Sequence, residues 1–508
     1  MVGGNLTFEA LPDDVLLLVF SLCNPRGHAV KPVTWQWCRL AHVCQRWRRI
    51  VFASPRYLGL VIVTGDRHES YSGSWSVRRA LACWPAALPI AIRRRGICEA
   101  FPMPDDDEDD ILAGLKHPDR IYEINFSFSW GMLGKSESAS LAWSFPELER
   151  LEFRGAHGFD IDAPRGFLGG STPTSHKLRH IKLLKITFPS LPQLLLSNHN
   201  LVYLSLGRGL FIGERYEHIS PDTLAFCLSA ATQLKILHVE IRSNLLNPKQ
   251  RSTHSESLSP NLTLLPSLVE FDFKGPNGYL EDLVSSIRSP LLRRIGVSIT
   301  LMGVRPLDLS NLCQLLSQSK YLQSLPFQTS IEIEEDGFEI VHDFEPPPPR
   351  ESISLNVDFG GHEAWDVSRV VHFSGKLSPP SPGVERLIIS ALCVPPSLRD
   401  EPDTVRWLQL LMPFNGAQEV HLCDTDHSYD GIVNALHESI NMGQEVFPAL
   451  RILRLCGYGT KTPQGIKSFV DERQRTGKTV NVVHRREWPR SGWSRSGHYD
   501  DEDEETVT

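Results

Sequence analysis

The chain has 508 residues, of which 41% are hydrophobic and 22% charged, and its formal net charge is −8 at pH 7. These proportions are typical of globular proteins, so most of the chain should fold. The net negative charge argues against a nucleic-acid-binding protein, which usually presents a basic face. Glu9, Asp13 and Asp14 interrupt the apolar start, so no secretory signal is predicted, and no run of about 18 apolar residues predicts a membrane-spanning helix.

The ten cysteines are scattered along the chain and form no CxxC pair. In a large chain without a predicted signal peptide, such cysteines are most often reduced and buried. We therefore expect a cytoplasmic and/or nuclear protein that binds neither membrane nor nucleic acid.

Two amphipathic helices are predicted in the first sixty residues. The sequence LPDD at residues 11–14 predicts a helix start, because proline fits the first turn and acids favour the positive end of the helix dipole. Apolar residues then recur at helical spacing as far as Leu22. After a break at residues 24–34, a second helical pattern runs from Leu40 to Val51, and Pro55 ends it.

The order of these residues resembles the F-box, a small three-helix unit with the pattern LP-x-E/D-x-L-x-x-I/V-F, a break, then L-x-x-V-C-x-x-W and a later proline. The matching residues, in order, are Leu11, Pro12, Asp14, Leu16, Phe20, Leu40, Val43, Cys44, Trp47 and Pro55. The break between the two halves is longer than usual in this family, so the middle helix is poorly defined by the sequence.

In the F-box family this unit docks onto the Skp-type adaptor of a cullin–RING ubiquitin ligase. The resemblance implies an F-box core of Phe20 and Trp47, and adaptor contacts by Leu11, Pro12, Leu16, Leu40, Val43 and Cys44. Three short helices bury too little apolar surface to be stable alone, which is compatible with a docking face completed by a partner. The alternative is that these helices pack against the rest of the chain.

Beyond residue 60 one short pattern recurs, apolar-x-x-apolar-x-apolar, in which the first, fourth and sixth residues are apolar. This pattern is typical of a strand, and we call it the strand phrase. Ten copies begin at Leu148, Leu178, Leu201, Leu234, Leu268, Leu292, Leu322, Val384, Ala417 and Leu450, and a degenerate copy begins at Ser352. Helical stretches such as 220–233 and 309–321 lie between copies. This order resembles leucine-rich repeats, which stack strands on a concave face and helices on a convex face.

These copies depart from regular leucine-rich repeats, because they vary in length and lack the usual Asn or Cys after the strand. An ordinary α/β domain rich in leucine is the alternative. Recognition residues are expected between the apolar positions of each phrase, and the candidates are Glu149, Glu152, Arg179, Lys182, Tyr203, Ser205, Lys235 and His238.

The predicted fold class is therefore α/β, with an F-box at residues 1–60, an irregular leucine-rich repeat solenoid at 61–485 and a disordered acidic tail at 486–508. Loops are expected near 102–110, 247–261 and 341–352, where the chain is acidic, polar or proline-rich. A terminal helix and strand at 466–484 should seal the last repeat with Ile466, Phe469 and Val470. The layout resembles the expanded F-box families of filamentous fungi.

Catalytic motifs are not evident. The sequence GKT at 477–479 lacks the upstream glycine of a P-loop, residues 207–213 miss the dinucleotide fingerprint, and neither G-x-S-x-G nor H-E-x-x-H occurs. A cluster at residues 421–427, with two histidines, one cysteine and two aspartates, is compatible with a metal site, although a polar loop after a strand is the favoured interpretation. We expect no enzyme activity, no cofactor and no metal.

The sequence thus predicts a non-catalytic substrate-recognition subunit of an SCF-type cullin–RING ubiquitin ligase. Its F-box would bind the Skp-type adaptor, and through it the cullin, while its repeats would bind a target protein of unknown identity. The alternative is a leucine-rich repeat interaction scaffold that takes no part in ubiquitination.

Overall fold

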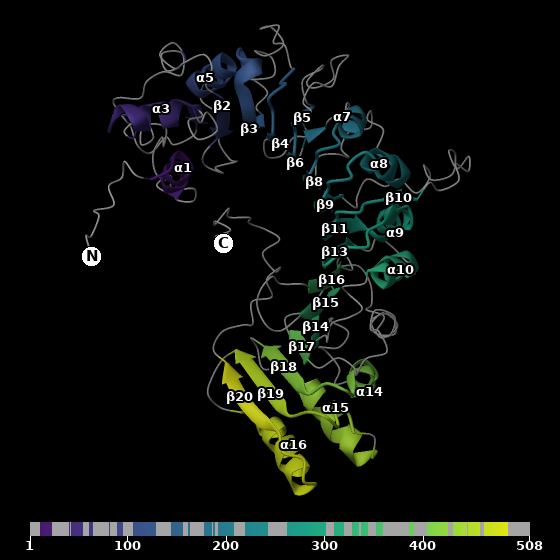
Figure 1. Ribbon diagram of the computed structural model, residues 1–508. Coiled ribbons are helices and arrows are strands. Elements are labelled where there is room, and N and C mark those ends of the chain that lie inside the picture. Colours follow the sequence, from purple (N-terminus) through teal and green to yellow (C-terminus); the bar gives the residue numbers. More distant parts are fainter. Residues whose placement is uncertain are drawn as a thin grey trace, which may run out of the picture. The chain divides into compact units, whose positions relative to one another are not determined.

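Figure 1 shows the computed structural model of the chain, which divides into two compact units, Met1–His218 with Tyr499–Thr508, and Ile219–His498. The structure describes residues 11–22, 40, 42–53, 60–64, 81, 89–94, 105–128, 144–155, 161–162, 177–184, 186–187, 191–207, 219–241, 262–300, 309–319, 328–334, 337–343, 352–358, 386–390, 404–424, 430–443, 445–457 and 462–485. The predicted loop at 247–261 and the predicted tail at 486–508 lie outside these residues. Within them, no helix is both long and apolar enough to cross a membrane.

The first unit begins with the helices α1 (Asp13–Leu22) and α3 (Gln45–Ala53) and continues into a parallel sheet. The strands of this sheet, in spatial order, are β1 (Leu60–Thr64), β2 (Ile90–Arg94), β3 (Ile121–Phe128), β4 (Arg150–Gly155), β6 (His180–Leu184) and β8 (Tyr203–Gly207). A separate parallel pair joins β5 (Ile161–Asp162) to β7 (Ile186–Thr187), and α7 (Leu191–Ser197) precedes β8. The order of these strands across the sheet therefore follows their order in the sequence.

Helix α5 (Asp105–Leu115) corrects part of the loop predicted near 102–110. Six acidic residues open this helix, where the dipole favours negative charge. The apolar end of the same helix supplies Ile111 and Leu115, which are 0% and 1% exposed. Burial of that end stabilises the helix and offsets the repulsion among the acids, which the local charge pattern alone did not predict. A short 3-10 turn, η3 (Pro118–Arg120), then leads into β3.

The strands of the second unit are hydrogen-bonded in the order β9-β11-β13-β16-β15-β14-β17-β18-β19-β20. Their bounds are β9 (Ile236–Glu240), β11 (Glu270–Pro276), β13 (Arg294–Thr300), β14 (Gln328–Glu334), β15 (Gly337–Asp343), β16 (Ser352–Asp358), β17 (Arg386–Ser390), β18 (Glu419–Asp424), β19 (Ile452–Gly457) and β20 (Asn481–Arg485). A small parallel pair joins β10 (Thr263–Leu264) to β12 (Ile287–Arg288). Most pairings in the sheet are parallel, but β15 runs antiparallel to both β14 and β16.

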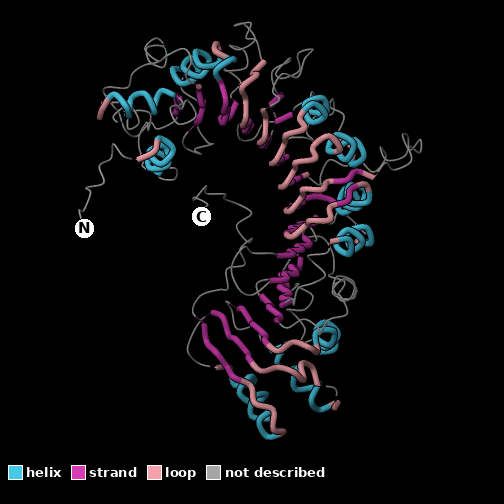
Figure 2. Tube along the Cα trace, viewed as in Figure 1, coloured by secondary structure: helices cyan, strands magenta, loops and turns pink. Residues whose placement is uncertain are grey.

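Helices accompany the strands of this unit in two groups. One group is α8 (Pro221–Leu228), α9 (Asn277–Ser285) and α10 (Ser310–Gln318), and the other is α14 (Thr404–Leu411), the 3-10 turn η7 (Met412–Phe414), α15 (Asp430–Asn441) and α16 (Gln464–Arg475). Figure 2 shows α8, α9 and α10 stacked along one side of the strands. Successive helices in each group pack on one another, so each group forms a layer over the sheet.

The strand phrase of the sequence coincides with this architecture. In the nine copies whose burial is described, the last two apolar residues lie on a strand and are at most 6% exposed, as are Leu151 and Phe153 in β4. Equivalent residues pair across neighbouring strands, for example Leu237 with Phe271 and Phe271 with Ile295. The recurring apolar positions thus form continuous rows in the core, and each fully buried side chain contributes about 1.5–3 kcal/mol.

The antiparallel strand β15 departs from the succession of similar repeats predicted for this region. The predicted copy at Leu322 lies outside the described residues, and β14 and β15 form a hairpin in which Glu334 pairs with Gly337. Residues 341–343 and 352 belong to β15 and β16, so they are not part of the predicted loop. The degenerate copy is displaced by two residues, because Ile353, and not Leu355, pairs with Ile295.

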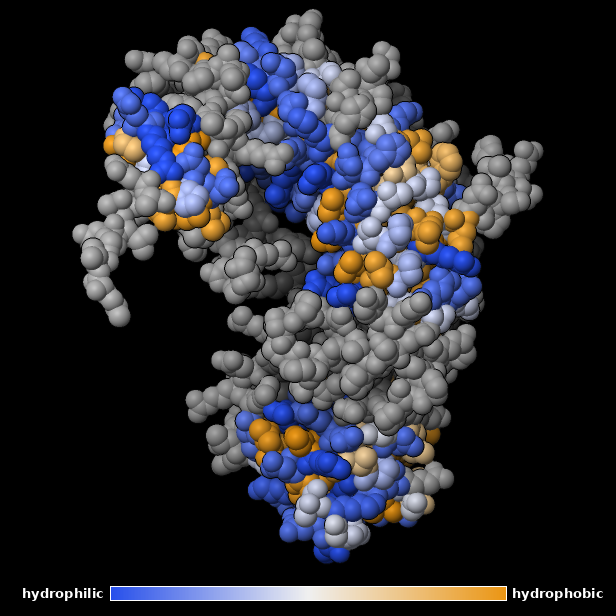
Figure 3. Space-filling model, viewed as in Figure 1, coloured by the Kyte–Doolittle hydropathy of each residue, from blue (hydrophilic) through white to orange (hydrophobic). Residues whose placement is uncertain are grey.

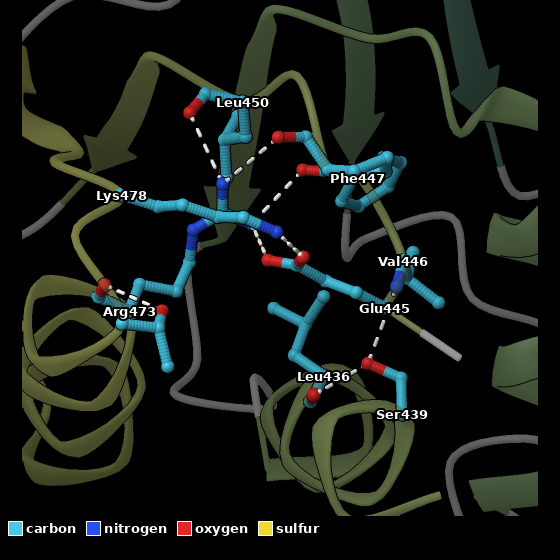
Figure 4. Close-up of polar contacts among 10 residues, drawn as sticks. Leu436, Ser439, Glu445, Val446, Phe447, Leu450, Arg473 and Lys478 are labelled. Atoms are coloured by element: carbon cyan, nitrogen blue, oxygen red, sulfur yellow. Dashed lines mark hydrogen bonds and ion pairs between the residues drawn. The ribbon is translucent and has the colours of Figure 1, made fainter. Parts of the chain in front are cut away.

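A buried arginine closes the C-terminal end of the second unit (Figure 4). Arg473 of α16 is 1% exposed, and its Nη1 donates to the carbonyl of Phe447 at 2.9 Å and lies 2.7 Å from Glu445 Oε1. Its Nη2 also faces the carbonyls of Pro448 and Leu450, each at 3.4 Å. The side chain therefore ties α16 to the segment that leads into β19. Ile466 and Phe469 of the same helix are each 1% exposed, and Val470 is half-buried.

Candidate functional site

Helices α1 and α3 pack around a small apolar core. Leu16, Phe20 and Ile50 are 0%, 1% and 3% exposed, and four half-buried residues pack against them, namely Leu11, Leu17, Leu40 and Trp47. The rings of Phe20 and Trp47 lie 4.7 Å apart between centroids at an angle of 59°. Tilted aromatic pairs at this separation are favourable beyond their buried area, so this contact helps to lock the two helices together.

A polar clamp joins the start of α1 to α3. The Arg46 guanidinium donates to Asp13 Oδ1 from Nε at 3.0 Å and from Nη2 at 2.6 Å, and Nη2 also donates to the carbonyl of Leu11. At the start of α1, the Leu16 amide donates to the Pro12 carbonyl at 3.1 Å. Because Asp13 lies in the first turn of α1, the clamp sets the position of the Leu-Pro segment relative to α3.

Cys44 precedes α3 and satisfies one of the amides at its start. Its Sγ accepts a hydrogen bond from the Trp47 amide at 3.4 Å, and its carbonyl accepts from Arg48 at 3.0 Å. A side-chain acceptor at this position stabilises a helix N-terminus. Cys44 thus supports the start of α3 and also remains exposed to solvent.

Exposed apolar side chains surround this core. Val15, Leu18 and Val43 are 39%, 60% and 59% exposed, and Pro12 is also exposed. Figure 3 shows hydrophobic side chains gathered at the position of α1. Solvation of large apolar side chains is unfavourable, so their concentration next to a packed core is typical of a surface that a partner covers. We call Pro12, Val15, Leu18 and Val43 the apolar rim.

The structure divides the residues predicted from sequence between the rim and the core. Of the six predicted adaptor contacts, Pro12, Val43 and Cys44 are exposed, Leu11 and Leu40 are half-buried, and Leu16 is fully buried beneath them. The predicted core residue Phe20 is buried and Trp47 is half-buried. The adaptor contacts of these residues stay a prediction.

Sequence reasoning placed Val15 and Leu18 in the apolar stripe of α1 but not among the predicted adaptor contacts. Both lie within the apolar stretch of α1, where the pattern does not separate the inner from the outer face because apolar residues occupy both. Only the packing of α3 decides that Leu16 and Phe20 turn inward. Helix α1 contains more apolar residues than one of its faces can hold, and that excess was the signal in the sequence that some of them would be exposed.

Polar side chains between the apolar rows form a second set of candidate residues. In the first unit, Arg93 binds Glu123 at 2.8 and 2.6 Å, and Arg150 and His180 both contact Glu152. Glu152 is buried, yet the contact with His180, whose Nε2 lies 3.0 Å from Glu152 Oε1, and the charge of Arg150 outweigh that burial and lower its pKa to about 2. It is therefore a fixed negative charge.

His180 and Tyr203 extend this cluster to the next two strands. Their rings stack at 4.1 Å between centroids and 4° between planes. Burial lowers the pKa of His180, although Glu152 opposes the shift. Of the predicted recognition residues, Glu152 and Tyr203 are thus brought together by adjacent strands, with His180 between them.

The second unit has two comparable clusters. On β9 and β11, His238 contacts Glu270 and Asp272. On β17 to β19, Glu419 contacts Arg386, His421 and Arg454. His421 belongs to the cluster considered for metal at 421–427, but its Nε2 contacts Glu419 at 2.7 Å, and residues 425–429 lie outside the described residues.

Comparison with known families identifies the N-terminal helices. Residues 8–56 match the family model described as F-box-like. No curated protein matches the chain. The match spans both helices and every residue of the predicted pattern from Leu11 to Pro55. Residues 8–56 are therefore an F-box-like domain, which supports the interpretation of the chain as an F-box protein.

Proposed function

We propose that the chain is a non-catalytic substrate-recognition subunit of an SCF-type cullin–RING ubiquitin ligase. The observation that carries this proposal is the F-box-like domain at residues 8–56, whose packed core supports an exposed apolar rim. The rim binds the Skp-type adaptor, and the adaptor connects the chain to the cullin. The protein acts in the cytoplasm, the nucleus or both.

The second part of the proposal is that the strands and helices beyond residue 60 form irregular leucine-rich repeats that bind a target protein. Recurring backbone bonds support it. The residue after the first apolar position of a copy accepts, at its backbone carbonyl, hydrogen bonds from two backbone amides of the next copy. The carbonyl of Glu149 accepts from the amides of Arg179 and His180, and that of Lys235 accepts from the amides of Val269 and Glu270. The same geometry therefore recurs in both units, although the hairpin β14–β15 interrupts it.

The chain in this role supplies proximity, and it supplies no reacting group. A target held by the repeats is brought close to the ubiquitin carrier bound elsewhere in the ligase, which raises the effective concentration of its lysines. No cofactor is required for this function. The polar clusters on the strands, with both signs of charge, are the proposed target-contacting groups.

Co-purification with a Skp-type adaptor and cullin tests the first part. Wild-type protein is expected to bind at one copy per adaptor. Leu18→Asp places a charge on the rim without entering the core, because Leu18 is 60% exposed, and it should weaken adaptor binding at least about tenfold. Phe226→Asp on α8 is the matched control, since Phe226 is equally exposed and equally apolar but lies in the second unit.

Equal binding of the two variants would contradict a role for the rim. Failure of the wild-type protein to bind the adaptor would withdraw the ligase assignment and favour the alternative, a repeat scaffold outside ubiquitination. Circular dichroism of each variant distinguishes lost binding from lost folding.

A further inference from the structure

Three metal-ligating side chains meet on the adjacent parallel strands β9 and β11. Asp272 pairs directly with His238 in the register of these strands, and Glu270 lies two residues before Asp272 on the same face of β11. One ligand atom from each of the three residues lies within 4.8 Å of the others. Strand pairing thus brings together groups that are far apart in the sequence.

The separations of His238 Nε2 from the two carboxylates suit one metal ion. His238 Nε2 lies 3.1 Å from Asp272 Oδ2 and 3.5 Å from Glu270 Oε1. Zinc bonds are about 2.0–2.1 Å long to histidine nitrogen and about 2.0–2.2 Å long to carboxylate oxygen, which in a tetrahedron separates neighbouring ligand atoms by roughly 3.3–3.5 Å. An ion could therefore be held with only small side-chain movements.

Groups around the cluster orient the two carboxylates. Arg294 of β13 binds Glu270 Oε2 at 3.1 Å, so the other oxygen, Oε1, is the one turned toward His238. Outer partners of this kind commonly orient the ligands of metal sites. On the far side of Asp272, the residue paired with it on β13 is Gly296, which has no side chain to occupy the space.

Asp272 itself is in an unfavourable environment without a cation. Its Oδ1 is buried and has no hydrogen-bond partner among the described residues. The side chain of Asp272 is only 20% exposed, and the second carboxylate, that of Glu270, lies on the same face of β11, so two negative charges lie close together. A bound cation would compensate for both the burial and the like charge.

We propose that His238, Glu270 and Asp272 bind a divalent transition-metal ion of the zinc or cobalt class. One imidazole and two carboxylates form a mixed nitrogen and oxygen set that such ions accept. Three protein ligands leave at least one coordination position for water or for a side chain of a bound partner. The side chains are 31%, 19% and 20% exposed, so solvent reaches the site.

Two other histidine clusters in the described part of the chain lack this combination. His180 faces one carboxylate, that of Glu152, beside Arg150. His421 contacts one carboxylate among the described residues, that of Glu419, which also contacts two arginines. A single carboxylate next to guanidinium groups disfavours a cation, so these clusters provide controls within the same chain.

Titration of the EDTA-treated full chain with Co²⁺ tests the proposal. The expected result is one ion per chain, with visible absorption typical of nitrogen and oxygen ligands and no thiolate charge-transfer band. Zn²⁺ should displace the Co²⁺, as followed by loss of that absorption. His238→Gln and Asp272→Asn should each weaken binding by at least about 100-fold, the upper end of the loss seen when only an outer partner is removed.

The control variant His180→Gln should bind as wild type does, and circular dichroism should show that all variants are folded. Each of three results would overturn the proposal: the absence of saturable Co²⁺ binding, the presence of a thiolate absorption band, or equal affinity of wild type and Asp272→Asn for the ion. Adaptor binding is measured separately, and it is not required for metal binding, so failure of one proposal leaves the other intact.

Discussion

Replacement of Arg473 by methionine should destabilise the C-terminal end of the second unit by about 2–4 kcal/mol. Methionine approximates the length of the arginine stem but carries no donors. The variant loses the 2.9 Å bond to Phe447 and the ion pair to Glu445. A hydrogen bond that involves a charged group contributes about 1.5–3 kcal/mol, and an unpaired buried acceptor adds a further penalty.

Two features of the structure limit this loss. The Phe447 carbonyl still accepts the Leu450 amide at 3.0 Å, and Glu445 still pairs with Lys478. The bonds to Pro448 and Leu450 are long and contribute little. The estimate therefore lies below the roughly 3–5 kcal/mol expected when one partner of a buried pair is removed and the other is left alone.

Amide hydrogen exchange is the appropriate assay, because it reports local opening rather than global unfolding. Exchange in peptides that cover residues 464–485 should accelerate in Arg473→Met, while peptides from residues 121–155 in the first unit should be unchanged. Arg475→Met is the matched control, because Arg475 lies on the same helix and is exposed. Its effect should be within about 0.5 kcal/mol.

The reasoning would be refuted if α16 exchanged at the same rate in Arg473→Met and wild type. Such a result would mean that apolar packing by Ile466 and Phe469 alone closes this end of the unit. Arg473→Lys should be intermediate, because lysine keeps the charge but cannot donate to several acceptors at once from a planar fork.

Three further predictions concern other parts of the chain. The pKa of Glu152 is lowered to about 2, so its contribution of up to about 3 kcal/mol to the free energy of unfolding is present above pH 4.5 and is lost as pH falls from 4.5 to 2. Urea unfolding of Glu152→Gln should therefore depend less on acid pH than that of wild type. Parallel pH dependences of the two proteins would contradict this. Gly431→Ala should destabilise the second unit by about 1–3 kcal/mol in urea unfolding, because a Cβ at this position would lie 2.6 Å from Trp407 Nε1. As a control, Asn434→Ala should leave the stability unchanged, because Asn434 is exposed on the same helix. Trp47→Ala should lower the stability of the F-box-like domain by about 3 kcal/mol, because the contact with Phe20 is lost. Limited proteolysis should then cleave faster within residues 11–53 than in wild type, and an unchanged cleavage rate would contradict the prediction.

The repeated strands could be predicted because their signal is local. Apolar residues that alternate along a strand specify which face is buried, and equal spacing within each phrase keeps equivalent residues in register. Leu151, Leu237 and Phe271 are buried where the phrase placed them. The phrase failed at residues 328–358, where β14 and β15 instead form an antiparallel hairpin in which Glu334 pairs with Gly337.

The F-box-like domain was predictable for a different reason. Several uncommon residues stand at fixed offsets, so order alone identified the pattern that the family comparison later confirmed. The outward face of α1 was not predictable in the same way. Leu16 and Leu18 are chemically identical, and only the position of α3 leaves one at 0% and the other at 60% exposure.

The sequence by itself determined the N-terminal F-box pattern, most strand positions and the rows of apolar residues, since these depend on spacing between near neighbours. Tertiary structure decided which residues meet across strands and helices. His238 acquires two carboxylate neighbours only because β9 pairs with β11, and Arg473 is buried only because α16 folds over the segment before β19. Contacts between residues distant in the chain follow from pairing and packing, whose geometry the local pattern does not contain.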